Sequence, residues 1–286
     1  MMLYKLVKSR FIFVIPALVF LSLFVLIPIV SVFVMSFYDW DLLSPPQFAG
    51  IKNFLMMFKD RMFWNSILIS LKILIITVPF TFFIPLFLAL ALHRETTSSK
   101  VLRALFYWPY MMPAVAGTTM WKWLLSYDTG LLNYLLRIVG LKPVPWLLSP
   151  TPATMSIVFV RTWGMTGLLM MMFITGLQNI PNEYYEAAMI DGANRWQIFW
   201  KITFPLLKNT NLLVLVTSIA HVFRDFATIY VLTGGGPGYA TTVTPLYIYL
   251  TAFTQFRIGY AYTLSVVFLL ISFVIAMISL RIRESR

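Results

Sequence analysis

The sequence of 286 residues contains no cysteine, only 2 histidines and few charged residues, which make up 11% of the chain. The absence of cysteine excludes disulfide bonds, thiolate metal sites and cysteine nucleophiles. A soluble domain carries about 25% charged residues. Hydrophobic residues make up 60% of this chain, and this composition predicts an integral membrane protein.

Motifs for nucleotide and metal chemistry are also missing. No segment matches the G-x-x-x-x-G-K-[ST] pattern of nucleotide-binding loops. The glycine-rich segment Gly234–Gly238 has no lysine, and we expect it to form a turn. No cluster of His, Asp and Glu suggests a metal site. We therefore predict a chain with no catalytic residues, no bound metal and no ATP hydrolysis of its own.

Long apolar segments are abundant. A helix needs about 20 apolar residues to cross the hydrocarbon layer, and six segments reach this length: Phe11–Phe37, Ile67–Leu92, Ala104–Leu125, Met155–Leu177, Leu212–Leu232 and Ala261–Leu280. The first is longer than the apolar region of a signal peptide, which has about 7–15 residues, and no cleavage site follows. We predict an all-α protein with six transmembrane helices forming one domain over residues 1–286.

The positive charges predict the orientation in the membrane. The chain has 22 Lys and Arg against 10 Asp and Glu, a net charge of +12, and the charges lie in short clusters between the apolar segments. This arrangement indicates topology and not nucleic-acid binding. Twelve basic residues lie on the side of both termini, and seven lie on the other. The positive-inside rule therefore places both termini in the cytoplasm.

The longest cytoplasmic stretch, residues 178–211, is predicted to contain two short helices. Asn182 is a candidate N-cap, with Glu183 in the first turn where the helix dipole favours an acid. Gly192 is suited to the left-handed residue that ends a helix. Aromatic residues then mark a second amphipathic helix, which Pro205 is expected to break. Periodicity alone leaves open an interfacial helix pair that lies on lipid headgroups.

The same stretch resembles the EAA loop of ABC import permeases. It contains Glu186, Ala187 and Ala188, then Asp191, Gly192 and Ala193, and it ends with Ile202 and Pro205. The chain departs from the family pattern after this turn, with Phe204 in place of leucine and Asn209 where a second proline is common. Further segments, including 23–28, 103–109, 176–181 and 230–238, are similar to permeases of maltose-type sugar importers.

The resemblance implies the fold of a type I ABC importer permease in a bacterial inner membrane. It implies three kinds of partner besides lipid: a second permease subunit that forms a heterodimer, two copies of a cytoplasmic ATPase that binds ATP and Mg²⁺, and an extracytoplasmic solute-binding protein. It also implies transport by alternating access. The residues expected to couple the spans to the ATPase are Glu183, Glu186, Ala187, Ala188, Asp191, Gly192 and Ala193.

An ion-gradient-driven secondary transporter is the alternative from another class. Such proteins usually show two related halves and buried carboxylates. We detect no internal repeat, and Asp225 is the one acid inside a predicted span. The EAA-like loop favours the ATP-driven importer.

Charged residues inside the spans point to a solute path, because they are costly there. In maltose-type permeases the solute contacts come from the fourth and fifth core spans. The matching positions are Arg161, Gly164, Met165, Ser218, His221, Val222 and Asp225. The family's maltose site uses amides and an aromatic residue there, so this sequence suggests a sugar or derivative other than maltose. Two alternatives remain: Arg161 binds an anionic sugar derivative, or it pairs with Asp225 and leaves a neutral polar pocket.

Overall fold

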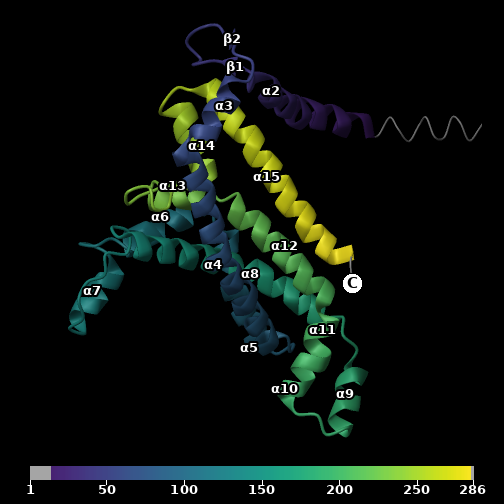
Figure 1. Cartoon of the computed structure of the whole chain (residues 1–286). Coiled ribbons are helices and arrows are strands. Elements are labelled where there is room, and N and C mark those ends of the chain that lie inside the picture. The colour runs from purple at the N-terminus through teal and green to yellow at the C-terminus, as the bar shows by residue number, and fades with distance from the viewer. Residues whose placement is uncertain (1–13, 285–286) are drawn as a thin grey trace, which may run out of the picture. The chain divides into compact units, whose positions relative to one another are not determined.

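The computed structural model describes residues 14–284, with side chains described as far as residue 277. The basic residues Lys5, Lys8 and Arg10 and the start of the first predicted span lie outside the described residues, as do Arg286 and the side chains of Arg281 and Arg283. The described chain is mostly helical (Figure 1). It divides into two compact units, one made of the chain up to Phe63 with Tyr247–Ile271 and the other of Trp64–Leu246 with the end of the chain.

The first unit begins with a helix over Val14–Met35, which includes the π-helical turn η1 (Ser22–Leu26) and α2 (Ile27–Met35). No part of its most apolar window is buried. This exposure suits a helix that faces lipid or another subunit. Two short antiparallel strands follow, β1 (Tyr38–Asp39) and β2 (Gln47–Phe48), and then α3 (Lys52–Lys59).

Polar contacts hold this unit together. The Asn53 amide donates to the backbone carbonyl oxygens of Ser36 and Tyr38 at 3.3 and 2.9 Å. Asp60 precedes α4 (Arg61–Leu92), and one of its carboxylate oxygens accepts from the backbone N–H groups of Met62 and Phe63. The other oxygen accepts from the hydroxyls of Tyr247 and Tyr260, each at 2.7 Å. Asp60 therefore joins the start of α4 to α14 (Thr244–Phe253) and α15 (Ile258–Glu284).

The second unit is built around α8 (Pro150–Gln178), which is buried along most of its length. It packs against α5 (Thr97–Met111), α6 (Ala114–Leu124), α12 (Lys208–Phe223) and α13 (Ala227–Leu232). The backbones of α5 and α8 cross closely at Gly167, where an added Cβ atom would collide with backbone atoms of Phe106 and Tyr107. A short helix, α7 (Leu131–Ile138), lies between α6 and α8 in sequence.

Two of the six predicted spans are not continuous helices. The segment Ala104–Leu125 is divided between α5 and α6 at Met112 and Pro113, because the residue before a proline is pushed out of the α-helical region. Met112 accordingly has an extended backbone, with ψ of 141°. The segment Leu212–Leu232 is interrupted between Phe223 and Ala227.

Within the described residues, four helices are long and apolar enough to cross a membrane: Val14–Met35, Arg61–Leu92, Pro150–Gln178 and Ile258–Met277. A bent pair, Arg195–Leu206 with Lys208–Phe223, raises the number to five if it forms one span. The predicted count of six therefore stays a prediction. Pro79 and Pro85 lie within α4 without ending it, as membrane helices tolerate when neighbouring groups satisfy the freed carbonyls.

Candidate functional site

The predicted coupling stretch consists of α9 (Asn182–Ile190), α10 (Arg195–Ile198), the π-helical turn η2 (Phe199–Thr203) and α11 (Phe204–Leu206). Figure 1 shows α9 and α10 beside each other. Gly192 has a φ of +78°, as predicted, and the N–H of Ala193 bonds to the carbonyl of Ala188 at 2.9 Å. This 6→1 bond closes the helix end in the usual way.

Two local predictions for this stretch are wrong. Asn182 is the first helical residue of α9, the N-cap is Pro181, and no side chain caps the helix. Pro205 does not end the second helix, which continues to Leu206 and bends by 70° before Lys208. The π-helical turn lies directly before this proline. Proline has no N–H to donate, and a π-helical turn is a common way to accommodate such a gap in the ladder.

The surface of the coupling stretch is open to solvent and carries exposed apolar residues beside its acids. Five of the predicted coupling residues are exposed: Glu183, Glu186, Ala187, Asp191 and Gly192. Ala193 is half-buried, and Ala188 is buried. Ile190 is 86% exposed, and Met189 and Tyr184 are also exposed. Met189 and Ile190 were not predicted from the sequence as part of this surface. Their position between Ala188 and Asp191, inside the EAA-like motif, could have indicated it. Such a patch of apolar residues marks an interaction surface.

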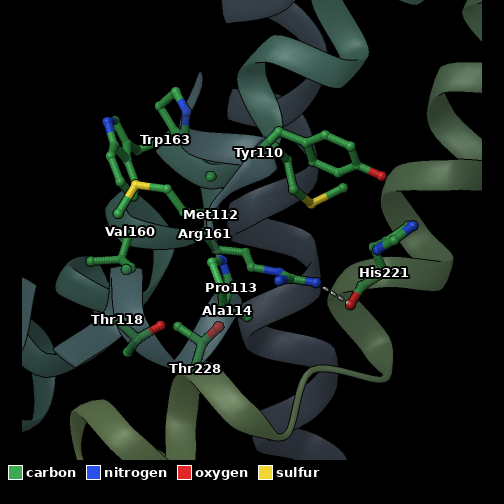
Figure 2. Close-up of a pocket in the computed structure, with 14 residues that line it drawn as sticks. Tyr110, Met112, Pro113, Ala114, Thr118, Val160, Arg161, Trp163, His221 and Thr228 are labelled. Carbon is green, nitrogen blue, oxygen red and sulfur yellow. Dashed lines mark hydrogen bonds between the residues drawn. The ribbon is translucent and has the colours of Figure 1, made fainter. Parts of the chain in front are cut away.

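A pocket of about 210 Å³ lies where α5 ends and α6 begins, against the middle of α8 (Figure 2). Arg161, Gly164, Met165 and His221 line it, as the sequence predicted for the solute path. The other walls were not predicted, and they include Tyr110, Met112, Pro113, Thr118, Trp163 and Thr228. Two prolines, Pro109 and Pro113, could have indicated these walls in the sequence, because the pocket lies at the helix break that Pro113 causes.

The remaining path residues lie elsewhere. Ser218 is fully buried, and its hydroxyl bonds to that of Thr81 on α4. Val222 is buried and does not line the pocket. α12 ends at Phe223, and Asp225 lies in the break that follows, not on the same helix as His221. There it lines a neighbouring cavity of about 380 Å³ together with Arg161 and His221.

The break between α12 and α13 is organised by Arg161 and Asp225. Asp225 accepts from the backbone N–H of Thr228 in the first turn of α13 at 3.2 Å. Its other carboxylate oxygen lies 3.2 Å from Nε of Arg161. An Nη atom of Arg161 donates to the carbonyl of His221 at 2.7 Å (Figure 2). This carbonyl lies in the last turn of α12, where it has no intrahelical partner.

The charges in the pocket are therefore compensated. The side chain of Arg161 is 18% exposed and that of Asp225 is 7% exposed. A charge at such a position is stable only when paired and hydrogen-bonded. The structure thus has the ion pair that the sequence left as one of two alternatives. The role of these residues in binding a solute stays a prediction. Among the described residues no group of three or more His, Asp or Glu is placed to hold a metal ion.

The long apolar helices are those expected of a multi-pass membrane protein. The family model "Binding-protein-dependent transport system inner membrane component" matches residues 81–285. The chain belongs to this family of ABC transporter permeases, which are transport components and not enzymes. Membership supports the ATP-driven importer over the ion-gradient-driven alternative.

Individual relatives match along nearly the whole chain. The trehalose/maltose transport system permease protein MalF of Thermococcus litoralis is 34% identical over 90% of this chain and 86% of its own length. The probable ABC transporter permease protein YurN of Bacillus subtilis is 34% identical, with 95% and 94% covered. The sulfoquinovosyl glycerol transport system permease protein SmoG of Agrobacterium fabrum is 32% identical, with 95% and 89% covered.

Solved structures show the same fold. A chain of a bacterial ABC transporter that imports the acidic polysaccharide alginate superposes with a TM-score of 0.87 over all of both chains, at 23% identity. A second structure contains the alginate transporter in complex with an alginate pentasaccharide-bound periplasmic protein, and the TM-score is 0.84 over 98% of this chain and 96% of that one. The fold of this chain is therefore that of an ABC importer permease.

Proposed function

We propose that this chain is a permease subunit that translocates a neutral sugar or sugar derivative by alternating access. An extracytoplasmic binding protein delivers the sugar, and a separate ATPase, present in two copies, binds ATP and Mg²⁺ and hydrolyses the ATP. A relative named for trehalose and maltose transport supports the class of substrate. Both termini lie in the cytoplasm in this proposal, because twelve of the basic residues flank the spans on that side.

The pairing of Arg161 with Asp225 carries the choice of a neutral substrate. An anionic solute gains less at a guanidinium whose charge is already offset by a neighbouring carboxylate. Here Nε of Arg161 faces Asp225, and one Nη faces the carbonyl of His221. The relatives named above differ in the sugars of their names at similar identity, so the charge of the substrate is argued from the pocket alone.

A second permease subunit is expected to complete the solute path. The pocket in this chain holds about 210 Å³, which is less than the roughly 300–1,000 Å³ of ordinary ligand sites. The exposed helix Val14–Met35 offers a surface for such a subunit. The exposed apolar residues of α9, together with Glu186 and Gly192, would contact the ATPase.

The substrate is tested by screening the cognate binding protein against neutral and anionic sugars, with ATPase stimulation of the reconstituted transporter as the readout. We expect stimulation by a neutral sugar. Stimulation by acidic sugars alone would contradict the neutral pocket. The coupling role is tested by Glu186→Lys, which we expect to abolish uptake and leave membrane insertion unchanged. Normal uptake by this variant would count against docking through α9.

A further inference from the structure

A groove of about 920 Å³ lies between the C-terminal part of α4, the end of α8 and the helices of the coupling stretch. All of its walls belong to the second unit. Figure 1 shows the corresponding region, where α4 ends beside α10. The groove is separate from the solute pocket, with which it shares no lining residue.

One wall of the groove is an apolar ladder on α4. Phe83, Phe87 and Leu90 line it, and their spacing of four and three residues places them on one face of the helix. The rings of Phe83 and Phe87 are stacked, with centroids 6.3 Å apart. Both side chains are nonetheless exposed, by 46% and 59%. Because α4 is a candidate membrane span that ends at Leu92, the ladder lies in the last three turns of that span.

The mouth of the groove is basic. His93 and Arg94 follow the last residue of α4, and Arg195 begins α10. All three are exposed. Arg103 donates to the carbonyls of Leu92 and Arg94 at 2.8 and 3.1 Å and so fixes the turn that carries Arg94. No Asp or Glu is among the residues that line the groove, so the charge at this mouth is not compensated from within it.

Aromatic residues also line the groove. Trp196 and Trp200 line the groove with their rings 5.6 Å apart. Tryptophan is favoured at the level of lipid headgroups, because its ring is amphipathic. The groove therefore combines apolar, aromatic and basic walls, which are the three kinds of surface that the acyl chain, the interface and the headgroup of a lipid need.

We propose that this groove binds an anionic phospholipid, with an acyl chain along Phe83 and Phe87 and the phosphate at Arg94 and Arg195. Basic pockets at the cytoplasmic ends of membrane helices suit such headgroups. A zwitterionic lipid would fill the channel but would leave the net positive charge uncompensated. Since the lipid would contact α4 and α10 together, it would brace the coupling stretch against the membrane helices.

The test uses the complete purified transporter, equilibrated with vesicles of phosphatidylglycerol and phosphatidylcholine, and native mass spectrometry of the retained lipid. We expect preferential retention of phosphatidylglycerol. The double variant Arg94→Gln/Arg195→Gln should bind it about thirtyfold more weakly, since each basic residue near a membrane surface contributes roughly fivefold to the affinity. The control Lys100→Gln/Lys201→Gln removes the same charge from exposed positions outside the groove and should leave retention unchanged.

Three outcomes would overturn the proposal: equal retention of both lipids by the unaltered protein, an equal loss in the control variant, or displacement of the lipid by soluble glycerol 3-phosphate. A photo-crosslinking residue in place of Phe87 gives an independent measurement that does not depend on the arginine variants. Capture of phospholipid supports the proposal. Capture of the second permease subunit would show that a protein surface fills the groove, and the lipid site would be wrong.

Discussion

Nε of Arg161 lies 3.2 Å from a carboxylate oxygen of Asp225, and this ion pair joins the middle of α8 to the break between α12 and α13. The same guanidinium satisfies the carbonyl of His221 at the end of α12. Asp225 in turn satisfies the N–H of Thr228 at the start of α13. One buried pair therefore supplies partners for both ends of an interrupted helix, and we infer that its main task is to hold that interruption in place.

The single variants Arg161→Ala and Asp225→Ala should each destabilise the transporter by about 3 kcal/mol or more, because each leaves one buried charge without its partner. The measurement is the yield and thermal stability of the assembled complex. The neutral double variant Arg161→Gln/Asp225→Asn should recover most of that stability. Full transport by the double variant would show that neither charge contacts the sugar. A stable but inactive Arg161→Ala would instead assign the residue to substrate binding.

Gly192→Pro should uncouple ATP hydrolysis from uptake, because proline cannot adopt the φ of +78° found there. A Cβ atom added at this glycine would meet no other atom within 4 Å. The residues tolerated here are therefore limited by the backbone conformation and not by space. Gly192→Asn is the matched control, since asparagine tolerates the left-handed region. It should retain most uptake in proteoliposomes. Similar activities of the two variants would contradict the need for this turn.

Gly167→Ala should destabilise the second unit by about 1–3 kcal/mol, because the new methyl group collides with the backbone of α5 and forces the helices apart. Small residues are typical of such close helix crossings in membranes. The control is Gly164→Ala on the same helix, where the added methyl group meets no atom within 4 Å. It should leave stability unchanged or raise it slightly. Thermal unfolding in detergent distinguishes the two.

Asp60→Asn should lower the stability of the first unit by about 2 kcal/mol at neutral pH, because a carboxylate accepts stronger hydrogen bonds than an amide. Burial of Asp60 opposes its ionisation, but the hydroxyls of Tyr260 and Tyr247 and two backbone N–H groups outweigh this and hold the pKa below its ordinary value of 3.8.

A depressed pKa gives a defined pH dependence. The stabilisation from ionised Asp60 is fully present above pH 3.8, the ordinary pKa, and is lost as the pH falls through the lower folded value. The difference in stability between the unaltered protein and Asp60→Asn should therefore shrink only in strong acid. Asp41→Asn, at an exposed carboxylate that bonds within its own turn, should have a smaller effect. A difference that disappears already near pH 6 would assign the effect to another group.

Reporter fusions test the orientation. Fusions at Lys100 and Asn194 should report the cytoplasm, and fusions at Arg137 and Gly236 should report the outside, because the basic clusters favour this arrangement. An external Asn194 would overturn the proposed coupling, since α9 and α10 must face the ATPase.

The sequence alone determined the membrane class and the turn at Gly192. Both depend on local information: a run such as Ile67–Leu92 is apolar over enough residues to span a bilayer, and Gly192 follows Asp191 at a point where only a left-handed residue ends the helix well. The family resemblance rests on motifs of the same local kind, and the family match confirms it.

Tertiary structure decided how the polar residues in the spans are used. Hydropathy treats Leu212–Leu232 as one apolar segment, but an interruption is stable when other helices satisfy its backbone groups, as Arg161 of α8 does for His221. The position of Ser218 likewise depends on a tertiary contact, because its hydroxyl bonds to that of Thr81, which is distant in sequence. The choice between an anion site and an ion pair at Arg161 depended on whether Asp225 reached it, and that distance is set by the packing of α8 against α12 and α13.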